Sequence, residues 1–215
     1  MGVSAGEALD RLLAGNRRFA AGGGTREGGA NAARRAELLS GQEPFAIILG
    51  CSDSRVPAEI VFDQGLGDLF VIRVAGNIVA PSQIGSVEFA AERFGTRLVV
   101  VLGHSRCGAV LATLEQLRAP GEAPSRNLRS IVDRIRPSVE GLLATEMAQD
   151  GKQLEREAVR ANVRAAAERL RHGSDVMERL ITKDGLRVLC AEYSLESGLV
   201  EVFGASTGGP TSGCS

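Results

Sequence analysis

Short apolar runs recur along the chain and are separated by longer segments in which apolar residues have helical spacing. The runs cover residues 45–49, 69–74, 98–102 and 186–190. Continuous apolar runs are typical of strands with helices over both faces, whereas a strand with one solvent-exposed face alternates apolar and polar residues. The pattern therefore predicts an α/β protein with a mostly parallel central β-sheet flanked by helices, built as a single domain over residues 1–215.

The segments between the runs predict the helices. Apolar periodicity indicates helices near residues 83–94, 107–118, 127–149, 152–172 and 174–182. Pro137 should end or kink the third of these, because proline lacks a backbone donor and clashes with the preceding turn. Asp150 and Gly151 then separate it from the next helix. Two or three helices are expected over residues 127–172.

The two ends of the chain differ from this core. Residues 1–40 predict an N-terminal helical arm, with a helix over 5–20, a connector containing five glycines over 22–29 and a second short helix over 31–39. Residues 205–215 are rich in glycine, serine and threonine and contain too little apolar material to pack alone. This last segment is expected to be a flexible tail.

Composition adds expectations about where the protein acts. The chain has 25 Lys and Arg against 26 Asp and Glu, so no overall charge favours nucleic acid or an anionic membrane surface. Residues 1–19 mix apolar and charged side chains and lack the unbroken apolar stretch of a signal peptide or membrane span, which indicates a cytoplasmic location. The four cysteines are interpreted as free thiols rather than as a disulfide framework. Cys190, inside an apolar run, is interpreted as a packing residue, and Cys214 is assigned no role.

Two polar motifs follow two of the apolar runs. These are Cys51-Ser-Asp53-Ser-Arg55, after 45–49, and His104-Ser-Arg-Cys107, after 98–102. Because the carboxyl ends of neighbouring parallel strands meet at one edge of a sheet, these side chains are expected to lie together. Two thiolates and one imidazole suit Zn²⁺ and leave a fourth position for water, or for the Asp53 carboxylate in a resting state. Singly, each cysteine or histidine is explained as well by packing, and a structural zinc site is the alternative for the set.

At these motifs the chain resembles the β-class carbonic anhydrases. The similarity is strongest over residues 44–110, where it includes 56–77 and 85–89. The resemblance implies one Zn²⁺ per subunit, bound by Cys51, His104 and Cys107. It also implies reversible hydration of CO₂ to bicarbonate and a proton by zinc-bound hydroxide.

The resemblance assigns a catalytic gate to two further residues. Similar proteins pair Asp53 with Arg55 through a charge-assisted hydrogen bond beside the metal. While Arg55 holds it, Asp53 accepts a hydrogen bond from the zinc-bound hydroxide, and when freed it occupies the fourth position of a closed state. A surface ion pair is the alternative for these two residues.

Four other residues match substrate-binding positions of the family. Gln42 stands where one branch of the family carries a glutamine that binds bicarbonate from the neighbouring subunit. Phe70, Ala75 and Phe89 match the apolar CO₂ pocket, although relatives often have valine and tyrosine at the last two positions. A polar loop residue is nearly as good an interpretation of Gln42, and a core position is an equal interpretation of the aromatic residues.

The resemblance also carries expectations about assembly. In similar enzymes the N-terminal helix packs on a second subunit and the active site lies at the dimer interface. A homodimer is therefore the minimum expected, with a homotetramer as the larger alternative. A helix packed on its own domain would show the same apolar face.

Two other functions fit the same residues. The nearest is hydrolysis of CS₂ or COS on the same fold, because those linear molecules are valence-isoelectronic with CO₂. The other is a catalytically silent, zinc-stabilised interaction protein. Such a protein would hold its ion with four fixed ligands and no exchangeable water, and the presence of Asp53 and Arg55 argues against it.

Overall fold

A computed structural model describes residues 2–24, 31–119 and 125–204. Its centre is a five-stranded sheet with the strand order β2-β1-β3-β4-β5. The strands are β1 (Ala46–Gly50), β2 (Leu69–Arg73), β3 (Leu98–His104), β4 (Arg187–Tyr193) and β5 (Val200–Phe203). β1 to β4 are parallel, and β5 pairs antiparallel with β4. The predicted fold class, an α/β protein with a mostly parallel central sheet, is confirmed.

The central strands are apolar throughout because both of their faces are covered. Every residue of β1 and of β3 is buried. Successive side chains alternate between the faces, so Ile47 and Leu49 belong to one core cluster and Ile48 to another. β2 lies at the edge of the sheet and is less completely buried.

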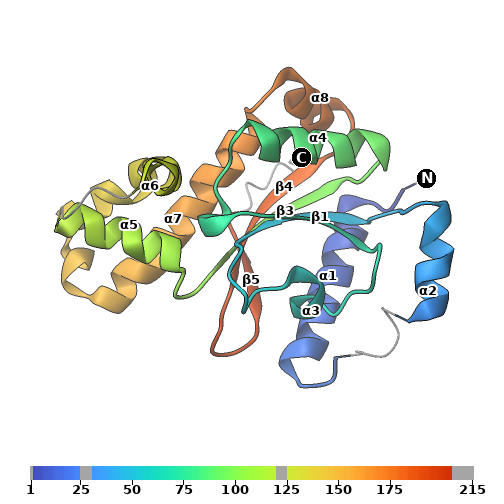
Figure 1. The fold of residues 1–215 in the computed structure, drawn as a ribbon, viewed down its shortest axis with the longest axis horizontal. Coiled ribbons are helices and arrows are strands. Elements are labelled where there is room, and N and C mark those ends of the chain that lie inside the picture. The colour runs from blue at the N-terminus through green and yellow to red at the C-terminus, as the bar shows by residue number, and fades with distance from the viewer. Residues whose placement is uncertain (1, 25–30, 120–124, 205–215) are drawn as a thin grey trace, which may run out of the picture.

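Helices cover both faces of the sheet (Figure 1). One face carries α1 (Ala5–Ala20) and α3 (Ala58–Val61), and the other carries α4 (Pro81–Arg93), α7 (Gly151–Arg171) and α8 (Asp175–Lys183). α5 (Gly108–Arg118) and α6 (Arg126–Val139) lie beside α7 at one end of the molecule. These three helices enclose a third apolar cluster that includes Cys51 and Cys107. The two polar motifs therefore lie at this third apolar cluster, to which each contributes a cysteine.

Most of the predicted helices are confirmed with shifted bounds. The helix predicted over 127–149 is divided into α6, which ends at Val139 shortly after Pro137, and two 3₁₀ segments, Glu140–Ala144 and Glu146–Gln149. The short helix predicted over 31–39 is α2 (Ala32–Glu37), followed by a 3₁₀ turn over Leu38–Ser40. The predicted tail over 205–215 and most of the glycine connector lie outside the described residues.

The strands differ from the prediction in two ways. β3 continues to His104, which pairs with Tyr193 of β4, so the expectation that His104 directly follows the strand is wrong. The ladder with β4 continues past the apolar run and fixes the backbone of the histidine. β5 is absent from the prediction, because it is short and mixes exposed and partly buried residues.

α1 packs on its own sheet in this structure. A Cβ atom at Gly15 would lie 1.8 Å from the carbonyl oxygen of Phe62, which shows how closely the helix approaches α3. Asn16 is buried and hydrogen-bonds the backbone of Val61, Gly198 and Val200. Packing of α1 on a partner subunit would have to use another face of the helix, and it stays a prediction.

We expect Gly15→Ala to destabilise the protein strongly, by about 3 kcal/mol or more, because the added methyl group must displace the backbone of α3. Gly6→Ala is the matched control in the same helix, since nothing lies within 4 Å of its Cβ position. The control should be neutral or stabilising by up to about 1 kcal/mol, as alanine favours helix over glycine. Urea unfolding of both variants measures the difference. Equal stability of the two variants would contradict the packing of α1 on α3.

Candidate metal centre

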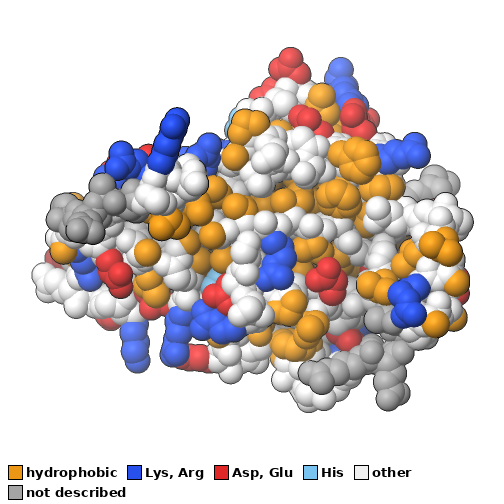
Figure 2. All heavy atoms as spheres, in the orientation of Figure 1, with side chains coloured by type: hydrophobic (Ala, Val, Ile, Leu, Met, Phe, Trp, Pro, Cys, Tyr) orange, Lys and Arg blue, Asp and Glu red, His pale blue; other side chains and the backbone are white. Residues whose placement is uncertain are grey.

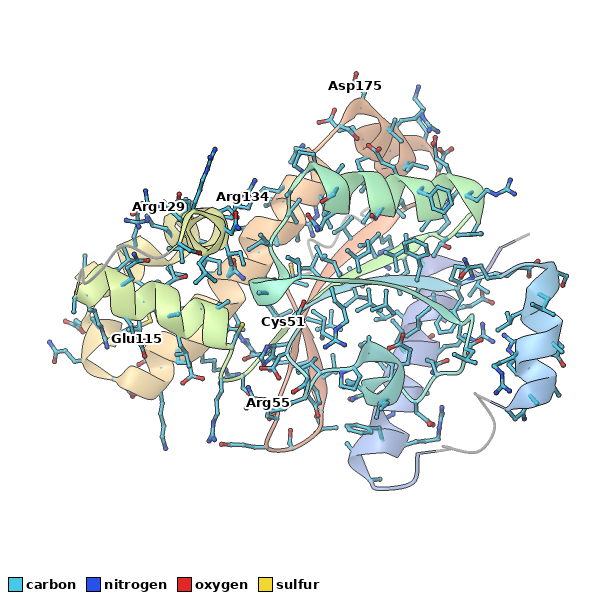
Figure 3. The ribbon with its side chains drawn as sticks, viewed as in Figure 1. Cys51, Arg55, Glu115, Arg129, Arg134 and Asp175 are labelled. Carbon is cyan, nitrogen blue, oxygen red and sulfur yellow. The ribbon has the colours of Figure 1, made fainter. Side chains whose placement is uncertain are left out.

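Three potential metal ligands converge at the carboxyl ends of β1 and β3. Cys51 is the first residue after β1, His104 is the last residue of β3, and Cys107 is the N-cap residue of α5. One ligand atom from each lies within 4.8 Å of the other two. All three are buried, with 5%, 0% and 1% of their surface exposed. Cys51 lies near the centre of the molecule, where β1 ends, with Arg55 beyond it (Figure 3).

The histidine has one ring nitrogen free for a cation. His104 Nδ1 lies 2.9 Å from the carbonyl oxygen of Ser105. Because a carbonyl oxygen can only accept, Nδ1 carries the ring proton and donates a hydrogen bond. Nε2 is fully buried and has no hydrogen-bond partner among the described residues. A buried polar atom without a partner is costly, whereas a lone pair beside two sulfur atoms is suited to a metal ion. The donor set therefore fits a soft or borderline divalent cation.

The two sulfur atoms differ in acidity. A hydrogen bond from the Cys107 thiol, together with those from the backbone N–H groups of Asp53 and Gly76, lowers the pKa of the Cys51 thiol to about 4, although burial opposes this shift. The hydrogen bond with Cys51, together with burial, raises the pKa of the Cys107 thiol. Both sulfurs bind a cation as thiolates, so a cation entering this site would displace the proton of the hydrogen bond between them.

Asp53 lies beside these ligands and is held by Arg55. The Arg55 guanidinium donates from Nε to Asp53 Oδ1 at 2.9 Å and from Nη2 to Oδ2 at 2.7 Å. This pairing holds the pKa of the Asp53 carboxyl well below its usual range, so the group is ionised at neutral pH. Asp53 Oδ2 is 3.9 Å from His104 Nε2. The Asp53 carboxylate therefore lies near one of the three candidate ligands.

Three residues that the sequence analysis leaves unassigned support the loops of the site. Arg73 donates from Nε to the Cys51 carbonyl at 3.0 Å and from Nη2 to the Asp53 carbonyl at 2.6 Å. Ser105 links the loop between His104 and Cys107 to the end of β4. Its N–H donates to the Tyr193 carbonyl, and its hydroxyl oxygen accepts from the Leu195 N–H. Gly76 donates its N–H to Cys51 Sγ at 3.3 Å. A charged residue inside the apolar run 69–74 is the one sequence signal that could have singled out Arg73.

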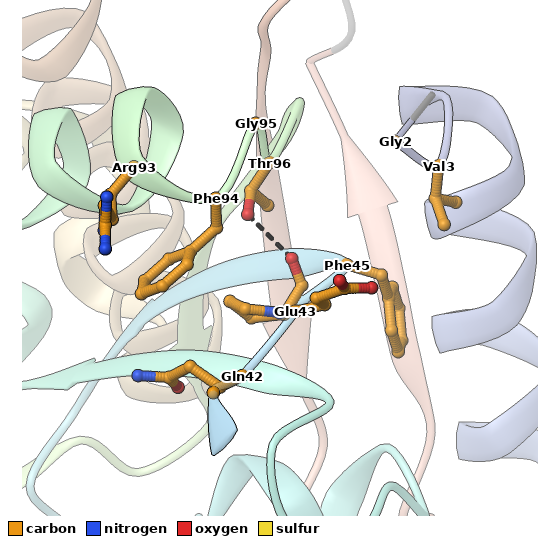
Figure 4. A pocket seen from close by; sticks show the side chains of 11 residues that line it. Gly2, Val3, Gln42, Glu43, Phe45, Arg93, Phe94, Gly95 and Thr96 are labelled. Atoms are coloured by element: carbon orange, nitrogen blue, oxygen red, sulfur yellow. Dashed lines mark hydrogen bonds between the residues drawn. The ribbon is translucent and has the colours of Figure 1, made fainter. Parts of the chain in front are cut away.

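The predicted substrate residues are divided between two places. Ala75 lies two residues beyond β2, at the same edge of the sheet as Cys51. Phe70 pairs with Ile47 near the start of β1, and its ring lies 6.2 Å from that of Phe89, which is 54% exposed on α4. Gln42 precedes β1 and lines a pocket of about 480 Å³ with Phe45, Phe94 and Thr96 (Figure 4). The chain does not bring Gln42, Phe70 or Phe89 to its own metal ligands.

An apolar groove of about 650 Å³ is lined by residues of the loop after β2 and of the two helices that follow β3, α5 and α6. The lining residues include Ala75, Ala109, Ala112, Leu128, Ile131 and Val132. The groove is mostly apolar, and its lining includes Gly108 and Ala109, which directly follow Cys107 in the sequence.

Comparison with known proteins identifies the family. A family model described as carbonic anhydrase matches residues 46–200. Over 187 residues the chain is 39% identical to carbonic anhydrase 2 of Mycobacterium tuberculosis, and the match covers 87% of each protein. A crystal structure of tetrameric β-carbonic anhydrases from Sordaria macrospora superposes with a TM-score of 0.72 at 24% identity, covering 91% of this chain and 96% of that one. The chain belongs to the β-class carbonic anhydrase family.

A second relative matches more closely over a shorter range. A carbonic anhydrase of Mycolicibacterium smegmatis is 53% identical over 106 residues, which are 49% of this chain and 51% of that protein. The family match contains all four parallel strands and both ligand motifs of this β-class carbonic anhydrase. Within the ranges that the structure describes, none of the helices has the length and hydropathy needed to cross a bilayer.

We expect this β-class carbonic anhydrase to bind one divalent metal ion per chain. The Cys107→Ser variant should contain much less metal, because a serine hydroxyl replaces a thiolate ligand. Cys190→Ser is the matched control, since Cys190 is also buried and unpaired but is not part of the Cys51, His104 and Cys107 group. Elemental analysis of the purified proteins measures the metal content. Equal metal loss in both variants would show that Cys107 has no special role.

Proposed function

We propose that this protein catalyses the reversible hydration of CO₂ to bicarbonate and a proton, using one Zn²⁺ per subunit held by Cys51, His104 and Cys107. The observation that carries the proposal is the buried Nε2 of His104, which has no hydrogen-bond partner within the described ranges of the chain. It lies within 4.8 Å of both sulfur atoms and 3.9 Å from the Asp53 carboxylate. Family membership supports the same reaction.

The ligand set favours zinc in a catalytic role. Structural zinc sites are closed by four firm protein ligands, whereas catalytic sites have three and keep one exchangeable position. Here three residues provide a thiolate or imidazole, and the fourth candidate, Asp53, is held by Arg55. Bound zinc would supply a water molecule whose pKa is lowered toward neutrality, so that it can act as a nucleophile.

Asp53 would orient that water molecule. As an ionised carboxylate it can only accept hydrogen bonds, so a water proton that it holds cannot point toward CO₂. Arg55 keeps Asp53 in this orientation through two hydrogen bonds, and its Nη2 also donates to the Arg106 carbonyl at 3.3 Å. Loss of the Arg55 contact would free Asp53 to occupy the fourth metal position, which corresponds to the closed state expected from the resemblance.

The substrate residues support a site shared between subunits. Ala75 would contact CO₂ from the chain that holds the metal, while Gln42, Phe70 and Phe89 would come from a second subunit. Their separation from Cys51 within one chain and the exposure of Phe89 support this assignment. Hydrophobic side chains form a band across the middle of the face in Figure 2, as expected of a surface that a second copy covers. We therefore propose a homodimer at least, and the structural similarity to proteins described as tetrameric supports a homotetramer as an alternative.

Three buried, unpaired cysteines among the described residues also fit a reducing compartment. On this basis we infer a cytoplasmic location.

We expect Asp53→Asn to lower kcat/KM for CO₂ hydration by about 100-fold or more, because the amide can donate a hydrogen bond and no longer fixes the water proton. Metal content should stay at the wild-type level. Glu196→Gln is the control, as it removes an exposed carboxylate that pairs with Arg106 near the same loop. Stopped-flow proton release on mixing with CO₂ measures both variants, and parallel assays with CS₂ and COS test the rival hydrolase activity. Full activity of Asp53→Asn would contradict the role of Asp53.

A mixing experiment tests whether Gln42 acts across subunits. Gln42→Ala and Cys51→Ser should each lower activity as homo-oligomers. Co-expressed, the two variants should regain activity, because a mixed dimer contains one site with an intact Cys51 from one chain and an intact Gln42 from the other. A mixture no more active than the sum of its separate variants would contradict the shared site. Unchanged kcat/KM in Gln42→Ala alone would remove Gln42 from the site.

A further inference from the structure

α7 passes directly behind the candidate ligands. A Cβ atom at Gly103, the residue before His104, would lie 2.5 Å from Val163 Cγ2 and 3.2 Å from Val159 Cγ1, so the helix is in close contact with the end of β3. Asn162 lies beside these valines and is 2% exposed. A buried amide at this place needs polar partners, because an unpaired buried amide is costly.

Asn162 reaches the loop that contacts the Cys51 sulfur. Its Nδ2 donates to the carbonyl oxygen of Gly76 at 2.8 Å, across 86 residues of sequence. The N–H of the same glycine donates to Cys51 Sγ at 3.3 Å. A chain of two hydrogen bonds therefore runs from α7 through one residue of the loop to a candidate metal ligand.

Gly76 needs to be held in this position. Its backbone has φ 68° and ψ 20°, a left-handed conformation that suits glycine, and a Cβ atom there would lie 2.8 Å from Ile135 Cδ1. Glycine has no side chain to fix its two peptide planes, and its backbone is the most permissive of any residue. The hydrogen bond from Asn162 to the carbonyl group restricts the plane on one side of the glycine and so limits the direction of the N–H group on the other side.

We propose that Asn162 is a positioning residue that holds Gly76 so that its N–H points at Cys51 Sγ, and thereby sets how strongly this sulfur donates to the bound metal. The inference rests on the proposed metal site. A hydrogen bond to a metal-bound thiolate withdraws charge from the sulfur, which makes the metal a stronger Lewis acid. Two thiolate ligands otherwise reduce the acidity of a zinc-bound water, so a hydrogen bond of this kind favours the reaction.

A purely structural role makes a different prediction. If Asn162 only satisfies a buried carbonyl, its loss would lower stability without changing the metal. Asn16 offers a matched comparison, because it is also 2% exposed and also bonds backbone groups from distant segments. It lies on α1 and contacts none of the three ligands.

The test uses Co²⁺ in place of the native metal in the wild type, Asn162→Leu, Asn162→Ser and Asn16→Leu. Leucine has a similar size but no donor, and serine is too short to place a donor at the position of Nδ2. We expect both Asn162 variants to shift the sulfur-to-cobalt charge-transfer band to lower energy, because the sulfur keeps more of its charge. They should also weaken Co²⁺ binding about 10-fold or more, because the loop no longer holds Cys51 in position. Asn16→Leu should keep the wild-type band and affinity while losing stability to urea.

The outcomes separate this inference from the proposed function. Wild-type band energy and affinity in the Asn162 variants would overturn the positioning role and leave the metal site intact. A wild-type protein without any sulfur-to-cobalt band would overturn the positioning role and the proposed function together. If Asn162→Leu does not fold, the smaller Asn162→Ser decides, since it introduces no larger group into the core.

Discussion

His104 Nε2 is buried at the carboxyl end of β3 without a hydrogen-bond partner among the described residues, and two cysteine sulfurs face it. An unsatisfied buried acceptor typically costs about 1–3 kcal/mol, so a fold would not retain one without compensation. A bound cation would remove the penalty, because His104 Nε2 and both sulfurs would be its ligands. The arrangement of the neighbouring loops follows from the need to keep this nitrogen free and the sulfurs close to it.

The strand register and the hydrogen bonds around the site keep His104 Nε2 free and the sulfur atoms near it. The parallel register of β1 and β3 places Cys51 and His104 at the same edge of the sheet. β4 extends the ladder to His104, and the carbonyl of Ser105 accepts a hydrogen bond from Nδ1–H, which leaves Nε2 as the acceptor. On the solvent side, Arg55 holds the Asp53 carboxylate, so a negative charge stays beside the site.

The sheet and the ligand set follow from local sequence, but much of their support does not. Strands covered on both faces are apolar throughout, which is why β1 and β3 can be predicted from the sequence. Because the carboxyl ends of neighbouring parallel strands lie at one edge of the sheet, Cys51 and His104 are then expected together. The hydrogen bond from Asn162 to Gly76 joins residues that are 86 positions apart, so no local sequence pattern around Asn162 predicts it. β5 is short and partly exposed to solvent, and it pairs with β4, so its own sequence does not predict it. The assignment of Gln42, Phe70 and Phe89 depends on a second subunit, which periodicity in one chain does not describe.

X-ray absorption at the zinc edge of the protein as purified tests the central claim most directly, because it reports the ligand atoms themselves. The account predicts two sulfur scatterers at about 2.3 Å and one imidazole nitrogen at about 2.0–2.1 Å, with one further light atom completing the shell. A shell of four sulfurs, a shell without sulfur, or protein free of zinc would contradict it.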